Sequence, residues 1–245
     1  MRNFKIVVQY DGSRYKGWQI QQDNDLTVQG KIQAVLTKMA EEPVEVIGCD
    51  RTDIGAHAEN YIANFHTACD LSKDIILNYL YEFLPEDIVV KSIQEVGERF
   101  HARYNVKSMT YVYTIDNNTF RNVFNRKYTY HTDDKLDIFE MEKAAQVLVG
   151  THDFQSFTTL KVGNKSTVRT LNFIDITVND GIIKIEMNAN DFLWNMPRIV
   201  SGMLLEVGTG KLKASDVQKL LDEKKKPEGG PIAKAKGLCL TEVTY

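Results

Sequence analysis

The stretch TVQGKIQAVLTKMAEEPVEVI, residues 27–47, sets the pattern of the first part of the chain. Thr27 is a residue type that caps helices, and the apolar residues behind it recur at helical spacing: Val28, Ile32, Val35, Leu36 and Met39. Pro43 then ends the helix, because proline cannot donate the hydrogen bond that a continuing helix needs. The apolar run 44–47 that follows predicts a strand.

The segments on either side complete a recognisable order. Residues 3–10 (NFKIVVQY) alternate apolar and polar side chains, which predicts a strand. A second strand is predicted at 61–66, a helix capped by Ser72 at 72–83, and a further strand at 88–96. The resulting order, strand-helix-strand-strand-helix-strand, is that of a ferredoxin-like unit.

The second half repeats this order loosely. Strands are predicted at 107–115 and 127–131, and a helix begins at Asp137 and runs to Val149. Asn179-Asp180-Gly181 predicts a hairpin turn between strands 171–178 and 182–187. Helices starting at Pro197 and at Ser215 and a last strand at 238–245 follow. We therefore expect an α+β chain of two related halves, 1–103 and 104–245, sharing one joined sheet.

Composition excludes several classes of protein. The 245 residues are 43% hydrophobic and 26% charged, which is ordinary for a globular chain. Cys49, Cys69 and Cys239 are widely spaced and odd in number, so neither a disulfide framework nor a zinc site is expected. The sequence contains neither a run long enough to span a membrane nor a signal-peptide pattern. These features predict a cytoplasmic protein that does not bind membranes.

The distribution of charge leaves nucleic acid open as a partner despite a net charge of −3. Residues 1–100 hold 10 basic and 16 acidic side chains, whereas residues 101–245 hold 20 and 17. Within 99–131 a single acid, Asp116, stands against six basic residues: Arg99, Arg103, Lys107, Arg121, Arg126 and Lys127. A local basic stripe of this kind can attract polyphosphate, because attraction depends on the electric field near the contact rather than on the net charge of the protein.

Three segments are candidates for chemistry. Residues 48–58 (GCDRTDIGAHA) place Asp50 and Asp53 between two glycines, which suits either a catalytic carboxylate or an ordinary Asx-rich turn. Tyr111 and Tyr113 share one face of a strand and can form either a stacking platform for unpaired bases or part of the core. Arg198 stands in an apolar segment and needs a carboxylate, for which Asp53 is the candidate, unless it lies at the surface.

Taken together, the chain resembles the TruA family of tRNA pseudouridine synthases. The resemblance rests on nine motifs in the same order: Tyr10-Asp11-Gly12 with Gly17-Trp18; Thr27-Val28-Gln29-Gly30; Arg51-Thr52-Asp53 with Gly55 and His57-Ala58; Arg99-Phe100-His101-Ala102-Arg103; Tyr111 and Tyr113; His152-Asp153-Phe154; Val168-Arg169-Thr170; Phe192, Met196 and Arg198; and Ala235-Lys236-Gly237-Leu238.

This resemblance implies two ferredoxin-like, RRM-like halves with a joined antiparallel sheet flanked by helices, and an active-site cleft between the halves. It also implies a homodimer that isomerises uridine to pseudouridine in the tRNA anticodon stem-loop, at positions 38–40. The isomerisation is redox-neutral, so no cofactor or metal is expected. Asp53 resembles the catalytic aspartate and Arg198 the arginine that pairs with it, while Tyr111 resembles the tyrosine that stacks on the flipped uracil. Arg51 resembles the residue that helps to extrude the nucleotide.

Further basic and polar residues are expected to contact the substrate: Arg14, Arg99, His101, Arg103 and Arg169. The chain departs from the family pattern at Asp50, where glycine is common, and at Ile54, where alanine is usual. It departs again at Trp194, Asn195 and Pro197, in a segment that is commonly rich in histidine. These departures indicate a divergent paralogue and bear on which uridine is modified.

Two competing hypotheses remain at this point. One is a tRNA-binding or chaperone protein that has lost catalysis. Binding alone does not require that Asp53, Tyr111 and Arg198 be present together, so the presence of all three does not follow from this hypothesis. The other is an unrelated hydrolase that uses Asp50 and Asp53 as a carboxylate pair with separated pKa values. The hydrolase hypothesis leaves the aromatic and basic segments unexplained.

Overall fold

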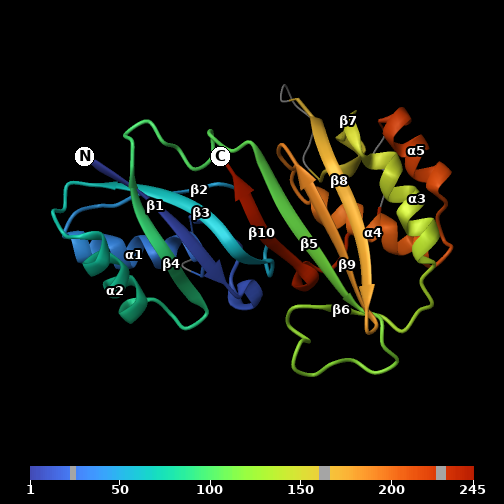
Figure 1. Cartoon of the computed structure of the whole chain (residues 1–245), viewed down its shortest axis with the longest axis horizontal. Helices are drawn as coiled ribbons and strands as arrows, with labels where there is room; N and C mark the ends of the chain where they lie inside the picture. Colours follow the sequence, from blue (N-terminus) through green and yellow to red (C-terminus); the bar gives the residue numbers. More distant parts are fainter. Residues whose placement is uncertain (23–25, 160–165, 225–229) are drawn as a thin grey trace. The chain divides into compact units, whose positions relative to one another are not determined.

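The computed structural model describes residues 1–22, 26–159, 166–224 and 230–245 (Figure 1). The chain forms two compact units: unit 1 comprises 1–107 and 239–245, and unit 2 comprises 108–238. The predicted halves, 1–103 and 104–245, differ from these units mainly at the C-terminus. The last strand, β10 (Leu238–Thr244), pairs in parallel with β3 (His57–Thr67), so the end of the chain lies with the first unit.

Unit 1 has the predicted order of elements. Strand β1 (Arg2–Tyr10) is followed by helix α1 (Val28–Ala40), strands β2 (Val46–Gly48) and β3, helix α2 (Lys73–Phe83) and strand β4 (Ile88–Val96). The strands lie in the order β4-β1-β3, with β2 beside β3 and antiparallel to it. This is the ferredoxin-like strand order, and it confirms the fold predicted for the first half.

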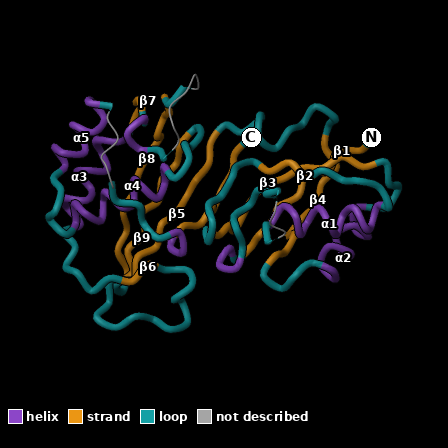
Figure 2. Tube along the Cα trace, turned by 180° about the vertical axis from the view of Figure 1, so that it is seen from behind, coloured by secondary structure: helices purple, strands orange, loops and turns teal. Residues whose placement is uncertain are grey.

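Side-chain patterning explains why these elements form. The alternating residues Phe4, Ile6 and Val8 of β1 are fully buried, as the period of a strand requires. Helix α1 begins where Thr27 accepts a hydrogen bond from the Gly30 amide at 3.2 Å, and α2 begins where Ser72 accepts one from Ile75 at 3.4 Å. Figure 2 shows both helices beside the sheet of unit 1.

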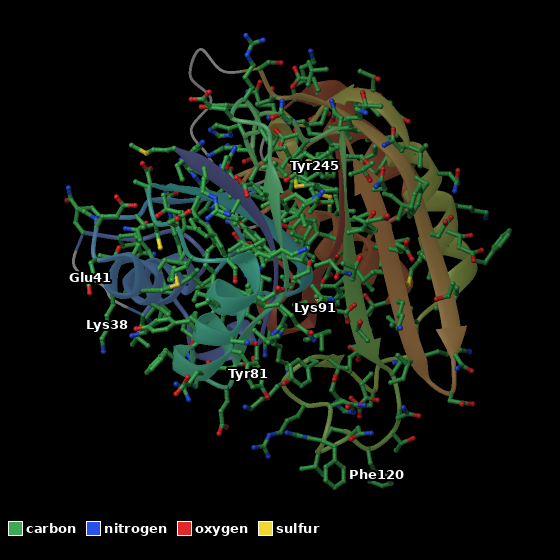
Figure 3. The ribbon with its side chains drawn as sticks, turned by 60° about the vertical axis from the view of Figure 1, so that its left-hand side comes forward. Lys38, Glu41, Tyr81, Lys91, Phe120 and Tyr245 are labelled. Carbon is green, nitrogen blue, oxygen red and sulfur yellow. The ribbon has the colours of Figure 1, made fainter. Side chains whose placement is uncertain are left out.

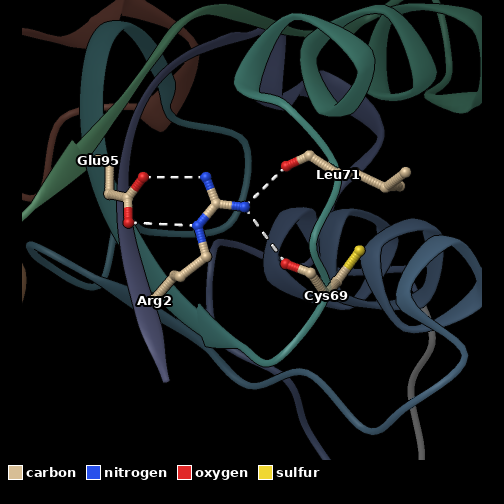
Figure 4. A network of polar contacts seen from close by, with 4 residues as sticks. All are labelled: Arg2, Cys69, Leu71 and Glu95. Atoms are coloured by element: carbon tan, nitrogen blue, oxygen red, sulfur yellow. Dashed lines mark hydrogen bonds and ion pairs between the residues drawn. The ribbon is translucent and has the colours of Figure 1, made fainter.

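Arg2 ties one end of this sheet together (Figure 4). Its guanidinium donates two hydrogen bonds to the Glu95 carboxylate of β4, at 3.2 and 2.9 Å, and two to the carbonyl oxygens of Cys69 and Leu71. The Arg2 hydrogen bonds hold the pKa of Glu95 below its usual value. One side chain therefore connects β1, β4 and the segment that leads into α2.

The strands of unit 2 pair antiparallel in the order β5-β9-β8-β7. Its elements are β5 (Ser108–Asp116), β6 (Tyr130–His131), α3 (Ile138–Leu148), β7 (Gly150–Asp153), β8 (Val168–Asn179), β9 (Ile182–Ala189), α4 (Met196–Gly208) and α5 (Ala214–Glu223). The predicted hairpin is confirmed, because Asp180 and Gly181 both adopt positive φ between β8 and β9. Strand β7 was not predicted, and the strand predicted at 127–131 is reduced to two residues.

The helices of unit 2 lie together beside its sheet (Figure 2). Helix α3 packs against β8, α4 and α5, and its first turn is capped by Asp137, which accepts a hydrogen bond from the Glu140 amide. Helix α4 is buried along most of its length. In the described part of the chain, no helix has the length and apolar character that crossing a membrane requires.

Candidate active site

The loop between β2 and β3, residues 49–56, carries the predicted catalytic aspartate. It closes in a tight turn in which the Ala56 amide donates a hydrogen bond to the Asp53 carbonyl at 3.1 Å, and Gly55 has φ of +79°. Asp53 is half-buried, whereas Arg51 and Ile54 in the same loop are exposed. The turn therefore holds a partly shielded carboxylate two residues from an exposed cation.

A wall of buried aromatic rings supports this loop. Trp18 and Tyr61 stack with ring centroids 3.9 Å apart, and Tyr10 packs against both. The Tyr10 hydroxyl lies 2.6 Å from Thr52 Oγ1, and the Tyr61 hydroxyl donates to the Asp50 carbonyl. Burial raises the pKa of both phenols well above the usual value, so they remain protonated. The two hydroxyls therefore hold the residues on either side of Arg51, one through the Asp50 backbone and one through the Thr52 side chain.

Two glycines let other parts of unit 1 approach the loop closely. A Cβ on Gly12 would lie 1.8 Å from the carbonyl oxygen of Ala56, so the turn after β1 packs directly on the end of the loop. A Cβ on Gly48 would lie 2.1 Å from the Tyr61 hydroxyl and 2.4 Å from Trp18 Nε1. Gly12, which ends the Tyr10-Asp11-Gly12 motif, and Gly48, which begins the segment 48–58, therefore shape the support of the Asp53 loop.

His57 and Cys49 are buried and contribute to the structure of the loop. His57 is 4% exposed, and its Nδ1 accepts a hydrogen bond from the Gly12 amide at 3.1 Å. The ring therefore braces the same Gly12 turn. Cys49 is also buried, and burial raises the pKa of its thiol well above the usual value. A protonated thiol is a weak nucleophile, which leaves the carboxylates as the reactive groups of this loop.

Arg198, in the first turn of α4, is held in place by two groups that the sequence did not reveal. Its Nε donates to the Ala233 carbonyl at 2.8 Å, and its Nη1 donates to Asn195 Oδ1 at 2.9 Å. Asn195 precedes α4 with φ of 60°, and its amide nitrogen donates to Thr159 Oγ1 at 2.7 Å. These contacts fix the plane of the half-buried guanidinium.

Tyr111 lies on β5 and is buried, at 2% exposed. Its ring meets that of Phe192 edge-on, with centroids 5.3 Å apart. Tyr113, Met109 and Ile115 are buried on the same face, and the Tyr113 hydroxyl donates to the Lys234 carbonyl at 3.1 Å. The shared face agrees with the strand periodicity, and the rings are part of the packed interior.

The structure places the three predicted catalytic residues in two units. Asp53 belongs to unit 1, whereas Tyr111 and Arg198 belong to unit 2. The pairing of Arg198 with Asp53 stays a prediction.

The segment around His101 is anchored by a buried pair of asparagines in unit 1. Asn64 donates to Asn3 Oδ1 at 3.0 Å and accepts from the Ala102 amide at 2.8 Å. His101 stacks on the exposed ring of Tyr104 at 4.1 Å. Burial, and next the charge of Arg103, lower the pKa of His101. The anchored segment presents its basic side chains, Arg99 and Arg103, to solvent.

The other predicted substrate-binding residues differ in their surroundings. Arg51 is exposed and makes no hydrogen bond or ion pair with any residue that the structure describes. Arg14 is exposed and lies 3.3 Å from the Asp87 carboxylate. Arg169 pairs with Asp191 at 2.9 Å and donates to the carbonyls of Ser166 and Val168. Arg51 is therefore open to a phosphate, whereas Arg14 and Arg169 each already have a carboxylate partner.

Comparisons with known proteins identify the family of the chain. A family model described as tRNA pseudouridine synthase matches residues 6–105 and 144–245, which include Asp53 and Arg198 but not Tyr111. Three relatives align over the full length of both chains. They are tRNA pseudouridine synthase A 1 of Clostridium tetani at 60% identity, tRNA pseudouridine synthase A 2 of Bacillus cereus at 43%, and tRNA pseudouridine synthase A of Acetivibrio thermocellus at 41%.

Among solved structures, the crystal structure of a Cbf5-Nop10-Gar1 complex is similar, with a TM-score of 0.34 and 10% identity. The match covers 96% of this chain and 57% of the other. A similarity of this size supports no argument about function.

Proposed function

Because the chain belongs to the tRNA pseudouridine synthase family, it is an isomerase of tRNA uridine, and we propose that it acts in the anticodon stem-loop, at positions 38–40. The observation that carries this proposal is the Asp53 loop, in which Asp53 is half-buried and its neighbours Asp50 and Thr52 bond to the packed rings of Tyr61 and Tyr10. The aspartate stands in a chain that is 60% identical over its full length to a tRNA pseudouridine synthase.

The target base has to leave its stack before any side chain can reach the sugar. Arg51, exposed two residues before Asp53, is the side chain that would help to extrude the nucleotide and hold its phosphate. Tyr111 would then supply a flat face for the extruded uracil. Because its ring is buried, the uracil would take the place of groups that now cover that face.

Asp53 would attack or deprotonate the nucleoside. The bond between N1 and C1′ breaks, the uracil rotates in place, and a bond between C5 and C1′ forms. The C5 hydrogen leaves as a proton, and N1 takes up a proton. Arg198 would keep the carboxylate ionised, since an adjacent cation favours the charged form. Exclusion of water would retain the detached uracil until the new bond forms.

Basic side chains outside the Asp53 loop would hold the RNA backbone. Arg14, Arg99 and Arg103 are exposed on unit 1, and His101 lies in the same anchored segment as the last two. Arg169 of unit 2 would reach a phosphate by exchanging its Asp191 partner. Binding through these contacts should weaken as salt rises, because each phosphate contact releases counterions.

Asn195 is expected to position Arg198, and Asn195→Gly tests this. Glycine retains the left-handed backbone but removes the oxygen that accepts from Nη1. Loss of one hydrogen bond to a charged group is worth about 1.5–3 kcal/mol, so kcat should fall by about 10- to 100-fold with KM little changed. Steady-state kinetics of pseudouridine formation provide the measurement.

Asp180→Gly is the matched control for this variant. Asp180 also has positive φ, at 48°, but lies in the hairpin turn of unit 2. It should leave kcat unchanged. If Asn195→Gly keeps the wild-type kcat, Asn195 does not position Arg198 for the reaction.

The family resemblance also supports a homodimer and a cytoplasmic location, where tRNA is available. Sedimentation of the purified chain should give a mass twice that of the 28.0 kDa protomer. A single protomer at micromolar concentration would exclude the dimer.

Mapping of pseudouridine in total tRNA tests the proposed function in cells. Comparison of cells with and without this protein should show pseudouridine lost at positions 38–40. If every site persists in its absence and the purified chain binds tRNA without modifying it, the protein is an inactive tRNA-binding protein instead.

A further inference from the structure

The loop between β5 and β6, residues 117–129, exposes an unusual set of side chains. Phe120 is 86% exposed and Phe124 is 92% exposed, with Val123 at 61% between them. Figure 3 shows the Phe120 ring at the outer edge of the loop, pointing away from the ribbon. The loop also carries Arg121, Arg126 and Lys127 and has no acidic residue. Aromatic and cationic side chains therefore alternate on one exposed segment.

Hydrogen bonds give this loop a defined conformation. Asp116, at the end of β5, is 1% exposed and accepts from the Asn122 amide at 2.8 Å and from Asn118 Nδ2 at 2.9 Å. Asn122 Oδ1 in turn accepts from the amides of Phe124 and Asn125. Side-chain bonds of this kind replace regular structure. The two rings are thus held outward by an ordered backbone, which lowers the entropy lost when they bind a partner.

Further cations gather at the base of the loop. Lys236 Nζ donates to the Arg126 carbonyl at 3.2 Å. Burial, and then the charges of Lys234 and Arg121, lower the pKa of Lys236. Lys236, Lys234 and Arg121 therefore lie close enough to one another to interact.

We propose that the β5–β6 loop is a second RNA contact of the protein, in which Phe120 and Phe124 stack on unpaired tRNA bases and Arg121 and Arg126 bind the adjoining phosphates. The proposal rests on the proposed function, which supplies tRNA as the partner. An apolar protein surface would satisfy the rings but not the cations, and two copies meeting through this loop would bring like charges together. Single-stranded RNA satisfies both, because every base has a flat face and every linkage a negative charge. The loop lies outside the residues that the family model matches.

The double variant Phe120→Ala/Phe124→Ala tests the stacking. Each lost base contact should weaken tRNA binding by about 5- to 150-fold. The dissociation constant is measured by fluorescence anisotropy with unmodified tRNA, and the rate of pseudouridine formation is measured in a single turnover at saturating tRNA. We expect weaker tRNA binding and an unchanged rate at saturating tRNA, since the loop contains none of the residues proposed to act on the reacting atoms. In Arg121→Gln/Arg126→Gln, the slope of log affinity against log salt should fall by about one per lost phosphate contact.

Two further variants separate stacking from general damage. Phe139→Ala removes a 64%-exposed phenylalanine from α3 of the same unit and should bind tRNA like the wild type. Phe124→Trp keeps a flat ring and should retain affinity, whereas Phe124→Leu keeps apolar volume and should lose it. Equal affinity of the leucine and tryptophan variants would contradict stacking.

The outcomes distinguish this proposal from the proposed function. Wild-type tRNA affinity in the double alanine variant, with pseudouridine still formed by the wild type, overturns the loop contact alone. If the double alanine variant binds tRNA more weakly but the wild type forms no pseudouridine, the loop contact is supported and the proposed enzyme activity is overturned. A dimeric wild type and a monomeric double variant in sedimentation would show that the loop joins two copies, and would also overturn the RNA contact.

Discussion

Replacement of Asp53 by asparagine is expected to abolish pseudouridine formation while tRNA binding survives. Asparagine matches the shape of the carboxylate, so the turn closed by the Asp53 carbonyl and the Ala56 amide should persist. What is lost is the negative charge that attacks or deprotonates the nucleoside. Removal of a group central to the chemistry lowers kcat by roughly 10⁴-fold or more. Single-turnover conversion and tRNA affinity, measured on the same preparation, provide the test.

Asp50→Asn is the matched control. Asp50 lies three residues earlier in the same loop, and its contacts with Tyr61 use the backbone carbonyl and amide rather than the carboxylate. The variant should therefore remain active. If Asp50→Asn lowers the rate of pseudouridine formation as much as Asp53→Asn does, the two carboxylates act as a pair and Asp53 has no distinct role.

Gly12→Ala should have the second largest effect, although Gly12 carries no reactive group. Its new Cβ would lie 1.8 Å from the Ala56 carbonyl oxygen, far inside contact distance, so the end of the Asp53 loop has to move. Displacement of a catalytic group by about 1 Å can lower the rate by about 100-fold. Overpacking should also lower the free energy of unfolding by about 1–3 kcal/mol. Steady-state kinetics and denaturant unfolding measure the two effects.

Gly97→Ala is the control for this substitution. Nothing lies within 4 Å of the position that a Cβ on Gly97 would take, so its free energy of unfolding should change by no more than about 0.5 kcal/mol. If Gly12→Ala keeps wild-type kcat, the packing of the Gly12 turn on the loop does not set the position of Asp53.

Local sequence signals predicted much of the fold because the responsible interactions are local. Thr27, Ser72 and Asp137 each accept a hydrogen bond from an amide three residues later, as the helix starts predicted. Asn179-Asp180-Gly181 forms the predicted hairpin for the same reason, since two of its residues adopt the left-handed conformation that this turn needs.

Features set by distant contacts were not predicted. The strand expected at 127–131 is shortened because Asp116 organises the preceding residues as a loop. The end of the chain lies in unit 1 because Cys239 and Leu240 pair with His57 and Ala58 of β3. The hydrophobic periodicity of residues 127–131 and of the last strand does not reveal these contacts with other parts of the chain.

The candidate site shows the same division. Asp53 and Arg198 were identified from motifs, but the groups that hold them were not. Asn195 reaches Arg198 only because it adopts a left-handed conformation before α4, and the Ala233 carbonyl arrives from a segment 35 residues later. The sequence signal for Asn195 was its departure from the family pattern beside Trp194.

The most direct test of the central claim follows the hydrogen at C5 of uridine. Purified protein is incubated with an anticodon stem-loop RNA that carries tritium at C5 of the uridines at positions 38–40. Because a bond from C5 to C1′ replaces the bond from C5 to hydrogen, the wild type should release tritium to water and Asp53→Asn should release none. Release by Asp53→Asn at the wild-type rate, or an inactive wild type that binds the RNA tightly, would contradict the account.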